Sequence, residues 1–280
     1  MDSKEKKVIE IVNQKHELAQ AILSKKCTIG IMGLGYVGLP LARAVVSQGY
    51  NCIGFDKNIK RIEKLNTGQT YIKTLSNEDI VSLNKSSKFF PTTNEHDIAK
   101  MDVILICVPT PLTKNREPDM NYVSSATKTI ASQLRKGQLI ILESTTYPGT
   151  TQELLSPMLE QSGLKIGKDI YLAYSPERED PGNVAYNTST IPKVVGADDD
   201  DSRELATTFY KQIITAVAEV STSATAEAVK LTENIFRFVN IALVNELKCI
   251  FSKMDIDIWE VIDAAKTKPF GYMPFYPGPG

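Results

Sequence analysis

Short runs of apolar residues alternate with more polar segments over most of the chain. Apolar runs of about four to eight residues without polar alternation are typical of strands buried on both faces of a sheet. Segments with helical character lie between them, for example Pro40–Gln48 and Ile59–Asn66. The pattern therefore predicts an α/β fold, a doubly wound parallel sheet covered by helices. The expected strands are Cys27–Met32, Asn51–Asp56, Met101–Val108, Gln138–Leu142, Ile170–Tyr174 and Lys193–Val195.

The two ends of the chain depart from this alternation. Residues 1–24 form a charged pattern with one apolar stripe, which predicts a helical appendage packed on the first domain. From Ala224 to about Lys253 no Gly or Pro interrupts, and apolar residues fall on more than one face, so we expect a long, largely buried helix. A second helix is expected at Ile258–Ala265, before a tail rich in Pro, Gly and aromatic residues. The predicted domains are therefore a sheet domain over 25–215 and a small all-α domain over 216–280.

Composition narrows the function classes. The chain has 280 residues, is 42% hydrophobic and carries a formal net charge of -1, so it offers no basic field for nucleic acid or an acidic membrane. The N-terminus is too polar for a signal peptide, and no apolar run approaches the roughly 20 residues that span a bilayer. We therefore expect a cytoplasmic protein without nucleic-acid or membrane partners.

The cysteine and histidine residues of the chain argue against a metal site and against catalytic mechanisms that depend on histidine. The four cysteines show no metal-ligand spacing, so no metal site is expected, and buried free thiols of a reducing compartment are the simplest interpretation. The two histidines, His16 and His96, both lie in polar surroundings. A Ser-His-Asp triad or a two-histidine zinc site is therefore excluded, and the chemistry must use lysine, carboxylate, hydroxyl or thiol groups.

A glycine-rich motif follows the first predicted strand and opens a helix. In it, Gly33 allows a tight turn, Gly35 lets the backbone approach a pyrophosphate, and Gly38 permits close contact between helix and strand. The next strand ends at Asp56, near the roughly twenty-residue offset expected for a carboxylate on the adenosine ribose. This spacing predicts a Rossmann-type domain that binds NAD, because an acidic residue there repels the 2′-phosphate of NADP. The alternative is a structural turn with a solvent-facing Asp56.

Other residues near this motif are candidates for the same cofactor. Tyr36 and Val37 lie inside the glycine turn. Arg61 lies on the helix after Asp56, where it could face the cofactor or be an ordinary surface arginine. Two further predicted strands end in polar segments, Val108-Pro109-Thr110 and the segment that contains Thr145. Ligands of open parallel sheets bind beyond the carboxyl ends of the strands, although hydroxyls there also form turns and helix caps.

Charged residues follow another predicted strand and mark the long helix. Glu177 lies in a loop directly after the strand Ile170–Tyr174. Lys230, Asn234 and Arg237 are spaced i, i+4 and i+7, which places them on one helix face. Such a polar stripe is costly within an apolar helix unless it meets a ligand, water or partner charges. A solvated loop and an exposed helix face are the alternatives.

Taken together, these motifs resemble the family of UDP-glucose/GDP-mannose dehydrogenases, which are nucleotide-sugar 6-dehydrogenases. The resemblance runs from about Cys27 to the end of the chain. Glu143–Thr151 and Glu177–Asn183 further resemble the branch that acts on UDP-N-acetylhexosamines. The segments that carry the family resemblance are Gly33–Gly38, Asp56, Val108–Pro111, Ser144–Thr151, Ser175–Glu177 and Ala226–Asn234.

The resemblance implies an NAD-dependent, two-step oxidation of the C6 alcohol of a nucleotide sugar, such as UDP-N-acetylglucosamine, to the uronate. Lys230 and Asn234 are implied to stabilise the oxyanion that develops at C6. Thr145 is implied to hold a water and to contact the nicotinamide end of the cofactor. Glu177 is implied to act through that water as general acid and base.

The remaining implied roles concern the cofactor and a partner chain. Asp56 and Arg61 are implied to hold the adenosine side of NAD, and Thr110 is implied to line the cofactor cleft. The long helix over 224–253 resembles the family's dimer core, so the resemblance implies a homodimer.

The chain departs from the family pattern at its C-terminus. In relatives a catalytic cysteine follows a stretch like Phe275–Gly280, and a nucleotide-sugar-binding domain comes after it; neither is present here. We therefore expect a C-terminally truncated chain that binds NAD and dimerises with little net sugar oxidation. Cys107 ends a predicted strand near the cofactor, but a structural thiol is the favoured interpretation of it. Two alternatives stay open, a complete two-electron dehydrogenase of the 3-hydroxyacid type and an inactive NAD-binding product.

Overall fold

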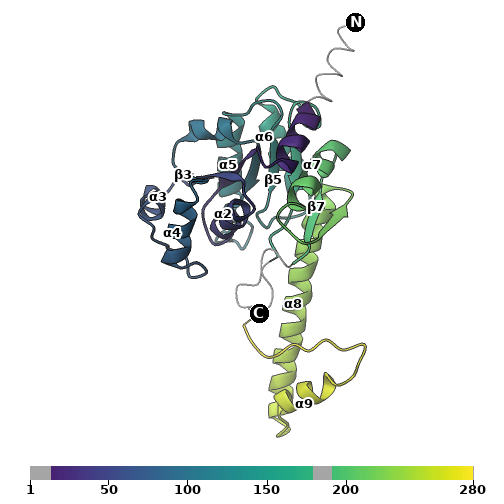
Figure 1. The fold of residues 1–280 in the computed structure, drawn as a ribbon. Coiled ribbons are helices and arrows are strands. Elements are labelled where there is room, and N and C mark those ends of the chain that lie inside the picture. Colours follow the sequence, from purple (N-terminus) through teal and green to yellow (C-terminus); the bar gives the residue numbers. More distant parts are fainter. Residues whose placement is uncertain (1–13, 179–190, 280) are drawn as a thin grey trace, which may run out of the picture. The chain divides into compact units, whose positions relative to one another are not determined.

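The structure is a computed structural model that describes residues 14–178 and 191–279 (Figure 1). The chain divides into two compact units, one up to Ala228 and one from Val229 onward. Within the described residues, no helix is long and apolar enough to cross a membrane.

Eight strands of the described residues form one sheet in the order β3-β2-β1-β4-β5-β6-β7-β8. The first six strands in this order are parallel, which confirms the predicted doubly wound sheet and matches the strand order of dinucleotide-binding domains. β7 pairs with β6 in the antiparallel direction, and β8 is parallel to β7, so the last two strands run opposite to the rest. The strands are β1 (Thr28–Met32), β2 (Asn51–Phe55), β3 (Phe89–Thr92), β4 (Val103–Ile106), β5 (Leu139–Leu142), β6 (Tyr171–Tyr174), β7 (Lys193–Gly196) and β8 (Val217–Val220).

Helices connect the strands and pack against them. α2 contacts β1 and β2, α7 contacts β5 to β8, and α5 packs against α6. A 3₁₀ turn at Glu95–Lys100 precedes β4, and a π-helical turn at Thr151–Leu155 leads into α6. The helices of this unit are α2 (Gly38–Ser47), α3 (Ile59–Asn66), α4 (Asn77–Lys85), α5 (Asn121–Ala131), α6 (Ser156–Glu160), α7 (Asp200–Tyr210) and the first turns of α8 (Ser223–Ser252).

The core is built on the central strands, in which every residue of β4, β5 and β6 is buried. Burial of consecutive residues means that both faces of the sheet are covered. One face packs against α2, α7 and the helix at 14–23, which contributes Leu18 and Ile22 to the core. Tyr50 also donates a hydrogen bond of 2.9 Å to the Ile22 carbonyl. Residues 14–23 of the predicted appendage thus form a helix that packs on the sheet, and residues 1–13 lie outside the described residues.

The unit that contains the sheet extends beyond the boundary that we expected at residue 215. It includes β8, which lies after that boundary, and the first turns of α8. β8 has half-exposed and exposed positions only, so its four residues lack the apolar run that identified the other strands.

The second unit has its own small core. Val244 of α8 packs with Ile258 and Ile262 of α9 (Ile258–Ala265). The aromatic tail contacts the same helices, because Tyr276 stacks on Trp259 and the Asn245 side chain bonds the backbone of Gly278. The prediction that α8 is largely buried is wrong for the single chain, in which many of its apolar side chains are exposed. The exposed ones include Leu231, Ile235, Phe236, Phe238, Val239, Leu243 and Ile250.

Candidate functional site

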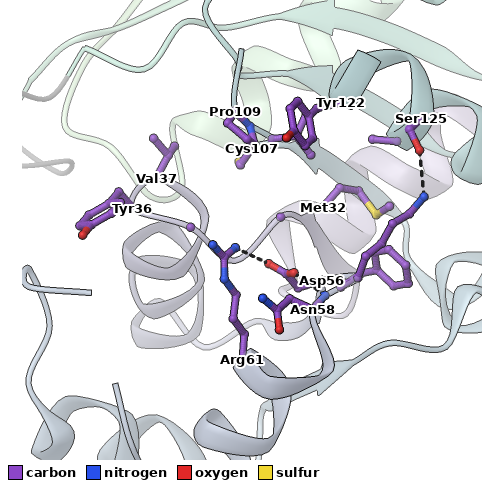
Figure 2. A pocket seen from close by; sticks show the side chains of 16 residues that line it. Met32, Tyr36, Val37, Asp56, Asn58, Arg61, Cys107, Pro109, Tyr122 and Ser125 are labelled. Atoms are coloured by element: carbon purple, nitrogen blue, oxygen red, sulfur yellow. Dashed lines mark hydrogen bonds and ion pairs between the residues drawn. The ribbon is translucent and has the colours of Figure 1, made fainter. Parts of the chain in front are cut away.

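A cavity of about 550 Å³ opens beyond the carboxyl ends of β1, β2 and β4 (Figure 2). The strand order reverses at β1, between β2 and β4, which is where open α/β sheets bind their ligands. Several lining residues had no signal in the sequence, among them Asn58, Tyr122 and Ser125. Of the predicted cofactor residues, the cavity is lined by Gly33, Gly35, Tyr36, Val37, Asp56, Arg61, Val108 and Pro109.

The glycines of the turn meet three different surroundings. Gly33 has a φ of +97°, a left-handed conformation that favours glycine. A Cβ on Gly38 would lie 2.0 Å from the Gly33 carbonyl oxygen, so the start of α2 packs directly on the turn. A Cβ on Gly35 would meet nothing within 4 Å, so this glycine faces the open cavity. The turn therefore leaves open space at Gly35, and the approach of a pyrophosphate to this glycine stays a prediction.

Asp56 lies at the end of β2 and is 7% exposed. Its Oδ2 accepts hydrogen bonds from the Leu34 backbone N–H and from Arg61, both at 3.0 Å. Its Oδ1 accepts one from the Asn58 backbone N–H at 2.9 Å. Figure 2 shows Arg61 reaching toward Asp56. The neighbouring Lys57 donates a hydrogen bond of 2.8 Å to the Ser125 hydroxyl of α5. The carboxylate is therefore held rigidly at the cavity wall rather than turned to solvent.

The predicted residues Thr110 and Thr145 lie in the loops after β4 and β5. The Thr110 hydroxyl donates to the Thr145 carbonyl oxygen at 2.7 Å, and the Ser144 hydroxyl donates to the Val108 carbonyl oxygen at 2.7 Å. Two hydrogen bonds thus join the loops at the same sheet edge. Thr145 itself is exposed, and its role stays a prediction.

Glu177 follows β6 and lies against a buried charge cluster that the sequence did not predict. Lys193 of β7 is 2.5 Å from Glu143 Oε2 and 3.3 Å from Glu177 Oε2. Tyr210 of α7 donates a hydrogen bond to the other oxygen of Glu143. The Glu177 side chain is 16% exposed, whereas Glu143 is fully buried. One buried ammonium therefore holds the Glu177 carboxylate at the edge of the sheet.

Burial and charge act against each other in this cluster. Burial raises the pKa of the Glu143 carboxyl, although the neighbouring ammonium lowers it. Burial by itself would lower the pKa of Lys193, but Glu143 and Glu177 raise it above its ordinary value. Lys193 is thus positively charged at neutral pH, and it partly compensates two carboxylates.

The thiols behave differently from one another. Cys27, Cys52 and Cys107 are buried, as predicted, whereas Cys249 is exposed. Burial raises the pKa of Cys107 well above its ordinary value, with Glu143 adding to the shift. Cys107 is therefore a protonated structural thiol, although it lines the cavity. Both histidines are exposed, in agreement with the sequence pattern.

Lys230 and Asn234 lie on α8 within the second unit. Both are half-buried, and Arg237 donates a hydrogen bond of 3.1 Å to Asn234 Oδ1. The predicted spacing on one helix face is thus present, while a catalytic role for Lys230 and Asn234 stays a prediction. Across the described residues there is no cluster of three or more His, Cys, Asp or Glu that could hold a metal ion.

The strand order, the glycine turn and the buried acid at the end of β2 define a dinucleotide-binding Rossmann domain. The chain belongs to the UDP-glucose/GDP-mannose dehydrogenase family. Residues 27–214 match the family's NAD binding domain, and residues 224–280 match its central domain. The predicted cofactor, NAD, is therefore confirmed.

Two relatives illustrate the similarity. The chain is 40% identical over 256 residues to a UDP-N-acetyl-D-glucosamine 6-dehydrogenase of Pseudomonas aeruginosa, covering 91% of this chain and 60% of the relative. A solved structure of UDP-D-ManNAc dehydrogenase from Pyrococcus horikoshii matches with a TM-score of 0.85 and 34% identity, covering 90% of this chain and 60% of that one. The chain thus spans about 60% of the length of these relatives.

A more distant likeness bears on the hydroxyacid alternative. A 3-hydroxyisobutyrate dehydrogenase of Mycobacterium tuberculosis matches with a TM-score of 0.64 at 16% identity. At this identity the likeness shows a shared fold alone, because one fold hosts many chemistries.

Proposed function

We propose that this chain supplies the NAD-binding and first-oxidation part of an enzyme that oxidises the C6 alcohol of a nucleotide sugar to the uronate. UDP-N-acetylglucosamine or a similar UDP-N-acetylhexosamine is the proposed substrate, since the Pseudomonas aeruginosa relative is named for it. The observation that carries the proposal is the cavity at the reversal point of the sheet, with open space at Gly35 and a buried carboxylate at Asp56.

The cavity suits the adenosine diphosphate half of the cofactor. The turn Gly33–Gly38 and the start of α2 present backbone N–H groups to the pyrophosphate. Asp56 accepts from the ribose hydroxyls, and Arg61 lies beside it on the adenosine side. The loops that carry Thr110 and Thr145 then lead toward the nicotinamide end.

The first oxidation removes a hydride from C6 and a proton from the C6 hydroxyl. NAD, when bound, accepts the hydride. Glu177 receives the proton through a water held by Thr145, and Lys193 keeps the Glu177 carboxylate in place for this task. Lys230 and Asn234 donate hydrogen bonds to the oxygen that becomes negative as the proton leaves.

The partner proposed for the second unit is another copy of this chain. Leu231, Ile235, Phe238 and Val239 are each at least 40% exposed. Their spacing of i, i+4, i+7 and i+8 forms one apolar stripe along α8. An isologous dimer would bury this stripe against its own equivalent, which explains why apolar residues at helical spacing remain exposed in the single chain.

The experiment that tests the function is NADH production with UDP-N-acetylglucosamine. We would compare this chain with a chimera that continues it with the remaining part of the Pseudomonas aeruginosa relative. The expected result is NAD binding by both proteins and sugar-dependent NADH formation by the chimera. In the chimera, Glu177→Gln and Lys230→Ala should each lower kcat by at least about 100-fold, because each removes a group that acts in the transition state.

Two outcomes would contradict the proposal. If neither protein forms NADH with any UDP-N-acetylhexosamine, the substrate class is wrong. If this chain binds neither NAD nor ADP-ribose, the cavity does not hold the cofactor.

A further inference from the structure

Arg61 is held between two partners at the cavity wall. On one side its Nη1 lies 3.0 Å from Asp56 Oδ2. On the other side its guanidinium lies 5.4 Å from the centroid of the Tyr71 ring, within the range of a cation–π interaction. The Arg61 side chain is 42% exposed, so without both partners it would sample many rotamers.

Tyr71 also contacts the glycine turn directly. Its hydroxyl donates a hydrogen bond of 2.5 Å to the carbonyl oxygen of Leu34, the residue after Gly33. The Leu34 backbone N–H donates in turn to Asp56 Oδ2. Tyr71, Leu34, Asp56 and Arg61 therefore form a closed ring of contacts around the adenosine side of the cavity.

The segment that carries Tyr71 is itself well anchored. It connects α3 to α4, and its neighbour Ile72 is 4% exposed in the main core. The Thr70 backbone N–H donates to the Asn77 side chain at 2.8 Å. Burial raises the pKa of Tyr71, and Asp56 raises it further, so the hydroxyl stays protonated as a donor at neutral pH.

We propose that Tyr71 is a positioning residue for the adenosine half of NAD, which orients Arg61 through its ring and the glycine turn through its hydroxyl before the cofactor arrives. Tyr71 does not line the cavity and acts through its two partners. Groups that are ordered before binding lose less conformational freedom on binding, and affinity rises accordingly. The proposal rests on the assignment of this cavity to NAD.

The test measures the dissociation constants of NAD and ADP-ribose by titration calorimetry. Tyr71→Phe removes the hydrogen bond to Leu34 and keeps the ring, and we expect a rise in Kd of about 3- to 5-fold. Tyr71→Leu also removes the ring, and we expect a rise of roughly 10-fold or more. The same factors should apply to ADP-ribose, because it contains the adenosine half and lacks the nicotinamide.

A double-mutant cycle separates positioning from general support of the fold. If the ring acts through Arg61, Tyr71→Leu should raise the Kd of NAD by a clearly smaller factor in an Arg61→Ala background than in the wild-type chain. A purely structural role predicts the same fold-change in both backgrounds. Tyr50→Phe is the matched control, because Tyr50 also donates its hydroxyl to a backbone carbonyl, at Ile22, and does not line the cavity.

The outcomes are distinguishable. Wild-type Kd values in folded Tyr71→Leu protein, or equal costs in the two Arg61 backgrounds, would overturn the positioning role. Absence of NAD binding by the wild-type chain would instead overturn the cofactor assignment, and the positioning role with it. If Tyr71→Leu does not fold, the Tyr71→Phe value decides, and a Kd within 2-fold of wild type contradicts the proposal.

Discussion

Gly35 and Gly38 are three residues apart, yet they have opposite surroundings. A Cβ on Gly35 would enter the open cavity, and a Cβ on Gly38 would collide with the Gly33 carbonyl. Gly35→Ala should therefore fold normally but raise the Kd of NAD by about 10-fold or more, because the methyl group would occupy the position proposed for the pyrophosphate. Gly38→Ala should instead destabilise the protein by roughly 3 kcal/mol, since backbone has to move.

Thermal unfolding and NAD titration of the Gly35→Ala and Gly38→Ala variants test these two predictions. A loss of about 3 kcal/mol corresponds to a decrease in Tm on the order of 5–10 °C for Gly38→Ala. A similar decrease for Gly35→Ala would contradict the open surroundings of that glycine. Unchanged NAD affinity in Gly35→Ala would contradict the pyrophosphate position.

Lys193 is the second residue whose substitution is informative. Lys193→Met leaves Glu143 and Glu177 without their shared ammonium, in a site where Glu143 is fully buried. Removing one partner of a buried ion pair typically costs about 3–5 kcal/mol, which is the expected decrease in the free energy of unfolding at pH 8. Urea unfolding of both proteins measures it.

The decrease in the free energy of unfolding caused by Lys193→Met should be larger at high pH than at low pH. In the folded protein the pKa of Glu143 is raised above its ordinary value of 4.5. Glu143 therefore destabilises the folded protein increasingly as the pH rises from about 4.5 through its folded-state pKa, because the carboxylate has to ionise while it is buried. Without Lys193 this pKa rises further, so the destabilisation should be largest at pH 8 and smaller at pH 5. Lys211→Met is the control, because Lys211 and Glu219 are about half-exposed and the loss should stay below about 1 kcal/mol. A pH-independent cost would contradict a charged Lys193.

At the scale of elements, the N-terminal part of α8 is tied to the loop after β5 by a buried carboxylate. Glu227 accepts hydrogen bonds from the Gly149 and Thr151 backbone N–H groups and from the Thr151 hydroxyl, at 2.6, 2.9 and 2.7 Å. Burial raises the pKa of Glu227, and these three donors lower it. The carboxylate thus accepts from the first backbone N–H of the helical turn that begins at Thr151 and from the Gly149 N–H just before it, and it holds α8 against this loop.

Glu227→Gln should therefore lower the free energy of unfolding by about 1–3 kcal/mol. An amide presents one acceptor oxygen and one donor nitrogen, so one backbone N–H faces another donor. Urea unfolding measures the cost, with the half-exposed Glu219→Gln as the matched control. Equal stability of Glu227→Gln and the wild-type chain would show that water replaces the carboxylate at this junction.

Most of the central elements could be predicted from local patterns. β1, β2, β4, β5, β6 and β7 coincide with the expected apolar runs, and α8 and α9 begin within one residue of the expected positions. β3 and β8 were not predicted, because each lies at an edge of the sheet and keeps exposed residues. The reversed direction of β7 was also not predictable, since strand direction depends on the path of the intervening chain rather than on the strand's own residues.

For the whole molecule, the apolar stripe of α8 leads to a prediction about assembly. Val239→Glu places a charge at a position that is 60% exposed in the single chain. If α8 pairs with a second copy, the variant should shift the protein from dimer to monomer in light scattering, and its NAD affinity should stay within 2-fold. Burial of an unpaired carboxylate in an apolar interface explains the expected loss.

Leu112→Glu is the matched control for assembly, because Leu112 is 67% exposed in the first unit and lies away from α8 in sequence. It should leave the oligomeric state unchanged. A wild-type chain that is monomeric at concentrations around 100 μM, or a dimer that survives Val239→Glu, would contradict pairing through this stripe.

The doubly wound sheet, the glycine turn with its acid at Asp56 and the choice of NAD all follow from the amino-acid sequence. These features depend on the spacing of residues that are close together in the chain, and this spacing can be read directly from the amino-acid sequence. Three contacts could be known only from the folded structure: Lys193 lies between Glu143 and Glu177, Lys57 bonds Ser125 at the cavity, and Tyr71 joins Arg61 to the turn. Their partners come from separate strands and loops, and only the packing of the sheet brings those segments together.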